Sequence, residues 1–185
     1  MYEKVTDSIL NVGINDPEVK KFENQFDLPE GMAYNSYLIL DEKVCLMDSV
    51  DADVTDAWME NVKTALSGRS IDYLVVQHME PDHSGSLEAI VDAYPDMKIV
   101  TSMQASKMMG QFFDRDFSDK VQLVKEGDTL SLGEHELSFI AAPMVHWPEV
   151  IMTYEKKEKI LFAADAFGKF GVREAEPDDW ACEAR

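Results

Sequence analysis

Short apolar runs alternate with stretches of helical periodicity along the 185 residues of the chain. Runs rich in β-branched and aromatic residues predict strands, and apolar residues that recur every three or four positions predict helices. The predicted strands are residues 2–12, 36–48, 73–76, 98–101, 121–124, 129–132, 136–140, 150–154 and 159–163. The predicted helices are residues 52–66, opened by Asp51 or Asp53, residues 87–93, and a helix that Ser102 caps and that runs through Phe113. Because strands and helices alternate, and no repeat or low-complexity linker divides the chain, the pattern predicts one α/β unit.

Two imidazoles and two carboxylates follow one of these strands within six residues, namely His78, Glu80, Asp82 and His83. α/β proteins usually place ligands at the carboxyl ends of strands, and these residue types are common metal ligands. Pro81 blocks a regular ladder or helix, so we expect an extended or looped backbone in which alternate side chains share a side. His83 would then add a ligand where the chain turns. The cluster predicts half of a two-metal site in preference to a loop of solvated carboxylates.

Two later segments carry residues that would complete such a site. His146 lies between Pro143 and Pro148, in a stretch that cannot form regular helix and would hold its side chain on a rigid loop. Asp165 follows the last predicted strand and precedes a turn. A carboxylate in that place can bridge two cations, although an Asp that caps a turn fits the same position.

The order of these residues resembles the metallo-β-lactamase fold, in which a His-x-His-x-Asp-His loop, a later His, a bridging Asp and a final His hold two metals inside an αββα sandwich. Glu80 stands where that motif has its second His. This difference, together with Glu-Pro-Asp-His-Ser-Gly, the His-Trp-Pro step and Leu-Phe-Ala-Ala-Asp-Ala-Phe-Gly, resembles the flavodiiron proteins, also called A-type flavoproteins. Residues 35–39 and 178–185 are similar to that family as well, so the resemblance covers essentially the whole chain.

The resemblance implies a set of six metal ligands. These are His78, Glu80 and His146 on one iron, Asp82 and His83 on the other, and Asp165 as the bridge between them. A carboxylate in place of an imidazole makes the site harder and more anionic, which favours iron and manganese over a nitrogen-rich dizinc site. Zinc also binds carboxylate and imidazole, so zinc or manganese could replace the two iron ions. Trp147 is expected to line the pocket or to pack beside the ligand loop.

One ligand of the family is missing, because no His follows Asp165. His135 does not replace it, since it precedes His146 in a turn between two predicted strands, where we expect an exposed hairpin residue. A predicted helix from about Pro177 reaches the end of the chain without a capping Gly or Asn. We therefore expect residues 1–185 to be a partial metallo-β-lactamase-like diiron domain, with an αββα sandwich that is incomplete at its C-terminal end.

The resemblance also implies a flavodoxin-like domain that binds FMN, which this chain does not contain. Electrons for the irons come from FMN in this family, commonly across the interface of a head-to-tail homodimer. A redox donor protein, either rubredoxin-like or a flavoprotein, would in turn reduce the flavin. The implied reaction reduces O2 to water, NO to N2O, or both, and the partial domain alone is expected to be inactive.

Two other functions are compatible with the residues. A dizinc hydrolase of the same fold would use a metal-bound hydroxide on an ester, thioester or amide, although Glu80 stands where such an enzyme normally has a second His. The chain could also be a catalytically inert scaffold fragment whose metal site is open.

Composition narrows the class of protein. The 36 acidic and 17 basic residues give a formal net charge of −19, which repels nucleic acid and anionic membranes. Two cysteines, Cys45 in an apolar run and Cys182, do not make a disulfide framework and favour a reducing, cytoplasmic location. The chain has no apolar run long enough for a membrane span and no secretory signal. Met103, Met108 and Met109 are expected to pack in the core or on a helix face.

Overall fold

The computed structural model describes residues 2–22 and 24–173. The predicted helix from Pro177, and with it Cys182, lies outside these described residues. Within them, none of the helices has the length and apolar character that crossing a lipid bilayer requires. The chain divides into two compact units, of which the larger comprises Met1–Ile14 and Tyr34–Gly168 and contains every predicted metal ligand.

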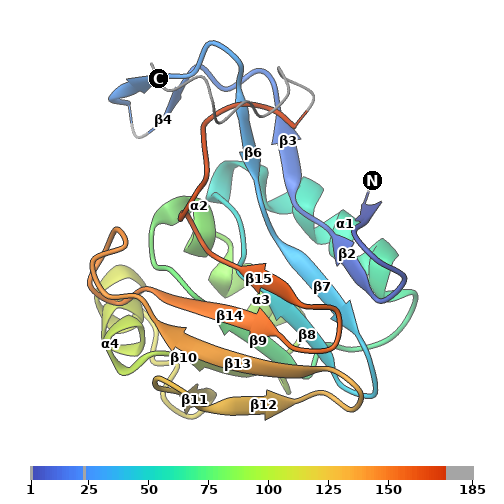
Figure 1. Ribbon diagram of the computed structural model, residues 1–185. Helices are drawn as coiled ribbons and strands as arrows, with labels where there is room; N and C mark the ends of the chain where they lie inside the picture. Colours follow the sequence, from blue (N-terminus) through green and yellow to red (C-terminus); the bar gives the residue numbers. More distant parts are fainter. Residues whose placement is uncertain (1, 23, 174–185) are drawn as a thin grey trace. The chain divides into compact units, whose positions relative to one another are not determined.

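A seven-stranded sheet forms the centre of the larger unit (Figure 1). Its strands, in spatial order, are β1 (Glu3–Lys4), β2 (Ile9–Asn11), β7 (Tyr37–Leu40), β8 (Val44–Met47), β9 (Tyr73–Val76), β10 (Lys98–Thr101) and β11 (Val121–Leu123). Neighbouring strands are antiparallel from β1 to β8 in this order, and they are parallel from β8 to β11. The predicted strands 2–12 and 36–48 are therefore wrong as single strands, because each is a hairpin of two.

A four-stranded antiparallel sheet faces the first one. Its strands, in spatial order, are β12 (Thr129–Ser131), β13 (Glu136–Ala141), β14 (Ile151–Glu155) and β15 (Ile160–Phe162). The core between the two sheets is made of side chains from both, among them Ile39, Cys45 and Val75 from the first and Phe139 and Phe162 from the second. Burial of Cys45 confirms its predicted place in the core.

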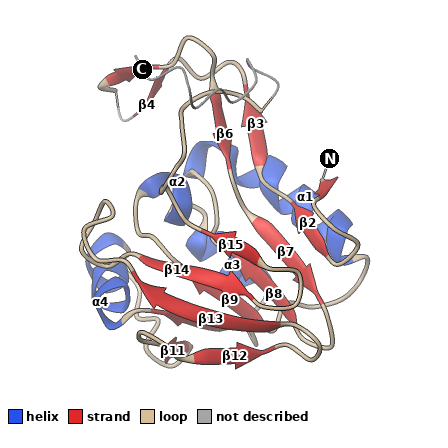
Figure 2. Ribbon diagram, in the orientation of Figure 1, coloured by secondary structure: helices blue, strands red, loops and turns tan. Residues whose placement is uncertain are grey.

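The helices of the larger unit are short segments that follow strands. They are the 3₁₀ helix η1 (Ala52–Val54), α1 (Thr55–Leu66), α2 (Pro81–Ser84), α3 (Leu87–Ala93) and α4 (Met103–Phe112). Figure 2 shows α1 and α3 behind the seven-stranded sheet, on the side away from β12–β15. On the other side of the molecule, Ile140 and Leu161 of the four-stranded sheet are 38% and 43% exposed. Three layers of an αββα sandwich, in the order α, β, β, are thus present among the described residues.

Caps explain where two of these helices begin. Asp51 accepts a hydrogen bond from the backbone N–H of Asp53 and opens η1, and Ser102 accepts one from Ala105 and caps α4, as predicted. On α4, Met108 and Met109 are buried, whereas Met103 in the first turn is 59% exposed and does not pack in the core. The predicted packing is confirmed for two of the three methionines.

The smaller unit comprises Asn15–Ala33 and the chain from Lys169 onward. It contains a hairpin of β4 (Lys21–Phe22) and β5 (Phe26–Asp27), and the ring of Phe170 lies 5.2 Å from that of Phe22. A short ribbon of β3 (Ile14–Asp16) and β6 (Met32–Tyr34) carries the chain between the two units. The sequence pattern did not predict these short strands.

His135 lies in the hairpin between β12 and β13, but the prediction that it is exposed is wrong. Its side chain is 1% exposed, with Nδ1 3.0 Å from Glu155 Oε1 and Nε2 3.0 Å from Ser8 Oγ. The backbone N–H of His135 donates to Asp41 Oδ2 at 2.6 Å. Partners from three distant segments therefore bury a residue whose local sequence indicates a surface turn.

We expect His135→Ala to lower the free energy of unfolding by about 3 kcal/mol, because it leaves the buried Glu155 carboxylate without its imidazole partner. Urea denaturation followed by circular dichroism measures the change. Lys157→Ala is the matched control, because it removes an exposed ion pair with Glu134 and should change stability by less than about 1 kcal/mol. Equal effects of the two substitutions would contradict the buried network.

Candidate metal centre

The carboxyl end of β9 delivers the first site residues. His78 and Glu80 follow this strand and are 0% and 5% exposed. Pro81 then begins α2, which corrects the predicted extended backbone. Proline is tolerated at the first position of a helix, because the N–H that it lacks would have no partner inside the helix. Asp82 and His83 consequently project from the first turn of a helix.

Helix α2 packs tightly against the segment before η1. Ser84 Oγ donates to the carbonyl oxygens of Met79 and Glu80, at 2.9 and 3.1 Å. At Gly85, a Cβ would lie 2.7 Å from both Pro81 O and Ala52 N, so only glycine allows this approach. The position of the Asp82 and His83 side chains depends on this contact.

Replacing Gly85 with Ala should destabilise the protein by about 1–3 kcal/mol, because the added methyl group overlaps two backbone atoms. The displacement of α2 should also weaken metal binding by Asp82 and His83. Gly110→Ala is the control, since a Cβ at Gly110 meets nothing within 4 Å. Thermal unfolding of the two variants, with and without added metal, measures both effects, and no difference between them would refute this account of α2.

A first group of ligand atoms forms around His78. His78 Nε2 lies 3.1 Å from Glu80 Oε2 and 3.2 Å from Asp165 Oδ2. His146, from the loop between β13 and β14, places its Nε2 2.8 Å from Glu80 Oε2 and 3.1 Å from Asp165 Oδ2. The ligand atoms of these four residues all lie within 4.8 Å of one another, as a shared metal ion requires.

A second group shares Asp165 with the first. Asp165 Oδ1 lies 2.5 Å from His83 Nε2, and Asp82 Oδ2 lies 3.7 Å from the same nitrogen. Each carboxylate oxygen of Asp165 thus faces a different group. The structure divides the six residues in the way that the family resemblance implies, with Asp165 between the two groups.

Two buried carboxylates that the sequence did not predict lie behind the imidazoles. Glu149 Oε1 is 2.7 Å from His78 Nδ1, and Asp48 Oδ2 is 3.4 Å from His83 Nδ1. Asp48 also accepts hydrogen bonds from the backbone N–H and the side-chain amide of Gln77, at 2.7 and 3.1 Å. Asp48 directly follows β8, next to β9 in the sheet, and this place at a strand end is the signal that could have identified it. Glu149 has no comparable signal.

The charges of the group favour bound cations. Burial lowers the pKa of His78, but hydrogen bonds with Asp165, Glu149 and Glu80 outweigh it and raise the pKa to about 11. Burial raises the pKa of Asp165, but hydrogen bonds with His78 and His83 outweigh it and hold that pKa well below its usual range. Protons on the imidazoles therefore compensate the carboxylates, and a metal ion would replace those protons.

Asp82 gives a further indication of fit to a metal. Its carboxyl is buried, and burial raises its pKa to about 6. Its Oδ1 has no hydrogen-bond partner among the described residues. A buried carboxylate oxygen without a partner is costly unless it is satisfied by a cation. The donor set of imidazole nitrogens and carboxylate oxygens fits iron, manganese or zinc.

Trp147 packs against the ligand imidazoles. Its ring meets that of His78 edge-on at 5.2 Å and lies 6.0 Å from His146 and 6.3 Å from Phe112. These contacts place Trp147, which is half-buried, beside the ligand imidazoles, and its role in lining the pocket stays a prediction. The His146 side chain is 54% exposed and that of Asp165 is 30% exposed, so the first group is open to solvent on the side of this loop.

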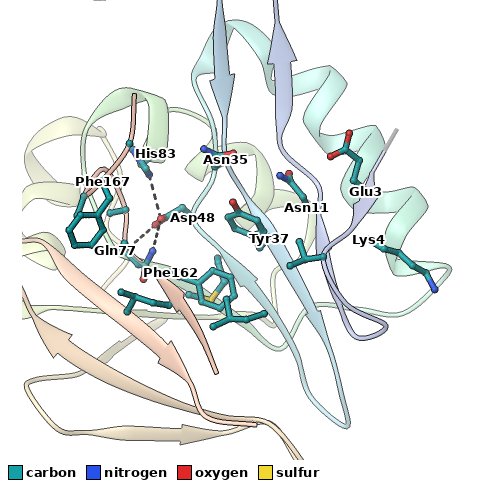
Figure 3. Close-up of a pocket in the computed structure, with 18 residues that line it drawn as sticks. Glu3, Lys4, Asn11, Asn35, Tyr37, Asp48, Gln77, His83, Phe162 and Phe167 are labelled. Carbon is teal, nitrogen blue, oxygen red and sulfur yellow. Dashed lines mark hydrogen bonds and ion pairs between the residues drawn. The ribbon is translucent and has the colours of Figure 1, made fainter. Parts of the chain in front are cut away.

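A cavity of about 410 Å³ adjoins the second group only (Figure 3). Residues of β1 and β15 line it together with Asp48, Gln77 and His83, and Figure 3 shows Asp48 between the other two. Gln77 Oε1 is buried and has no hydrogen-bond partner among the described residues. Among the described residues, His83 is thus the candidate ligand that lines this cavity.

Comparisons with known proteins identify the family of the chain. Residues 32–181 match the family model described as ODP family beta lactamase. The chain is 37% identical over 167 residues to rubredoxin-oxygen oxidoreductase of Megalodesulfovibrio gigas, covering 90% of this chain and 41% of the relative. It is 36% identical over 168 residues to anaerobic nitric oxide reductase flavorubredoxin of Vibrio vulnificus, covering 89% and 34%.

A solved structure shows the same fold. The flavodiiron protein from Giardia intestinalis superposes with a TM-score of 0.87 at 28% identity, covering 99% of this chain and 44% of that chain. The chain spans 25% to 41% of the length of the first curated relatives that it matches. The sequence similarity and the structural similarity thus concern one part of longer proteins.

Proposed function

Because the chain belongs to the ODP family of β-lactamase-like proteins, we propose that it is the metal-binding part of a flavodiiron oxidoreductase that reduces O2 to water, NO to N2O, or both. The observation that carries the proposal is Asp165, whose two carboxylate oxygens face two separate groups of ligand residues. The names of the similar proteins, an oxygen oxidoreductase and a nitric oxide reductase, support the two substrates.

Each candidate ligand has an expected role that follows from its place in the centre. His78, Glu80 and His146 would hold one iron ion, Asp82 and His83 would hold the other, and Asp165 would be shared by both. Two ferrous ions would supply two electrons, which suffice to convert two NO to N2O, and the four-electron reduction of O2 to water would take two more from the flavin. The carboxylates among the ligands would stabilise the higher metal charge after oxidation. The side chains of His146 and Asp165 leave one side open, where a diatomic molecule can approach, while Trp147 excludes water next to His78.

We place the flavin and the electron donor outside the 185 residues. FMN would be bound by a flavodoxin-like domain, and a rubredoxin-like protein or a flavoprotein would supply electrons to it. The active assembly would be a cytoplasmic homodimer in which FMN of one protomer faces the metals of its partner. Without a flavin the present chain would not sustain turnover, and only a single oxidation of bound ferrous iron is expected.

A single-turnover experiment tests this function. The chain is loaded anaerobically with Fe(II), and O2 or NO is added while iron oxidation and gas consumption are followed. Rapid oxidation, abolished in a variant without Asp165, is the expected result. Slow oxidation at the rate of free Fe(II), together with ester or thioester hydrolysis by the zinc-loaded chain, would overturn the proposal in favour of a dizinc hydrolase.

A further inference from the structure

Glu149 is a buried carboxylate between the loop that carries His146 and strand β14. It is 2% exposed. Ser102 Oγ, which caps α4, donates to the carbonyl oxygen of Glu149 at 2.9 Å and so ties its backbone to that helix. The backbone that carries the Glu149 side chain is therefore fixed by a contact that involves none of the candidate ligands.

One oxygen of Glu149 makes all the hydrogen bonds of its carboxylate within the described residues. Oε1 accepts from the backbone N–H of Met79 at 2.9 Å and lies 2.7 Å from His78 Nδ1, while Oε2 is buried without a partner. A carboxylate in an ionised state only accepts, so His78 must donate from Nδ1. This donation leaves Nε2 of His78 to face Glu80 and Asp165, where a metal would bind.

Among the described residues, neither of the other two imidazoles of the centre has an equally short contact with a carboxylate at Nδ1. His83 Nδ1 lies 3.4 Å from Asp48 Oδ2, and Asp48 already accepts two hydrogen bonds from Gln77. The His146 side chain is 54% exposed, on the open side of the centre. A carboxylate that accepts from a ligating imidazole fixes the tautomer of the ring and raises the basicity of the ligand. His78 therefore has the strongest support of the three.

We propose that Glu149 is a positioning residue that holds His78 with Nε2 toward the metal centre, and that it makes the group of His78, Glu80, His146 and Asp165 the tighter of the two metal sites. This inference rests on the proposed metal centre. The number of ligands points the same way, because four residues form this group and three form the other. The group that contains His78 would consequently fill first.

Titration of the metal-free chain with Co(II) against a competing chelator tests the order and the role of Glu149. Glu149→Leu removes both hydrogen bonds and should weaken the first binding step by about 10–100-fold. Glu149→Gln should restore most of the affinity, because its amide oxygen can accept from the same two N–H groups. Asp48→Leu is the matched substitution behind the other imidazole and should weaken the second step.

Nitrogen-15 NMR of the zinc-loaded chain reports the protonation of His78 Nδ1, which would not change if Glu149 only stabilised the fold. A hydrogen-bonded proton on His78 Nδ1 should be seen in wild type and in Glu149→Gln, and be absent in Glu149→Leu. If the wild-type chain binds two Co(II) ions and Glu149→Leu leaves the affinity of the first binding step unchanged, this inference alone is overturned. An equal loss in both steps that Glu149→Gln fails to rescue would also overturn it. A wild-type chain that binds no metal would overturn the proposed function together with the inference.

Discussion

Asp165→Ala should lower the metal content of the anaerobically loaded chain from about two ions to fewer than about one. The side chain of Asp165 is the only one that belongs to both groups of candidate ligands among the described residues. Its removal takes a ligand from each group and leaves the imidazoles of His78 and His83 without a common anion. Elemental analysis for Fe, Zn and Mn per chain measures the effect.

The control for this prediction is Asp92→Ala, which removes one carboxylate of the same type from an exposed position on α3, where it pairs with Arg115. Both variants change the net charge by one. If the two variants bound the same amount of metal as wild type, Asp165 would not be a bridge. If Asp92→Ala also lost metal, general acidity of the surface would explain the binding.

The metal-free protein should lose stability as the pH rises from about 6.5 toward 11. The pKa of His78 is raised from 6.5 to about 11 in the folded state, so the protonated form favours folding. The stability that this proton contributes is fully present below the unfolded pKa and is lost as the pH rises through the folded pKa. The loss should be on the order of 3 kcal/mol, since coupling to neighbouring groups makes it smaller than an isolated shift would give.

Chemical denaturation at pH 6.5, 8 and 10 measures this dependence, with the chain freed of metal by a chelator. Bound metal replaces the proton on His78, so the metal-loaded chain should show a much flatter profile over the same range. His78→Gln removes the titrating group and should flatten the profile of the metal-free chain. Stability of the metal-free wild type that rises with pH would contradict the assigned electrostatics.

The strands and helices that local pattern predicts well are those with a continuous apolar run and a clear cap. The strand at Tyr73–Val76 and the helix at Leu87–Ala93 have the predicted bounds, and α4 begins after Ser102 as expected. The run 36–48 is different, because the three charged residues 41–43 interrupt it and form the turn that divides it into two strands. Its two strands pair with each other as β7 and β8.

The ligand residues themselves could be chosen from the sequence, since four of them lie within six positions and the others stand at segment ends. Their geometry could not, because Pro81 begins a helix instead of preventing one. The supporting residues could not be found either. Glu149 is 71 positions from His78, and Asp48 is 35 positions from His83, so each contact exists only once the strands are assembled.

In the proposed centre, six residues hold two metal ions with Asp165 between them. Crystals of the iron-loaded chain, measured on both sides of the iron absorption edge, would show whether this arrangement exists. We expect two anomalous peaks about 3.5–4 Å apart, one beside His78 and His146 and one beside His83, with a carboxylate oxygen of Asp165 on each. A single peak, or peaks that do not involve Asp165, would contradict it.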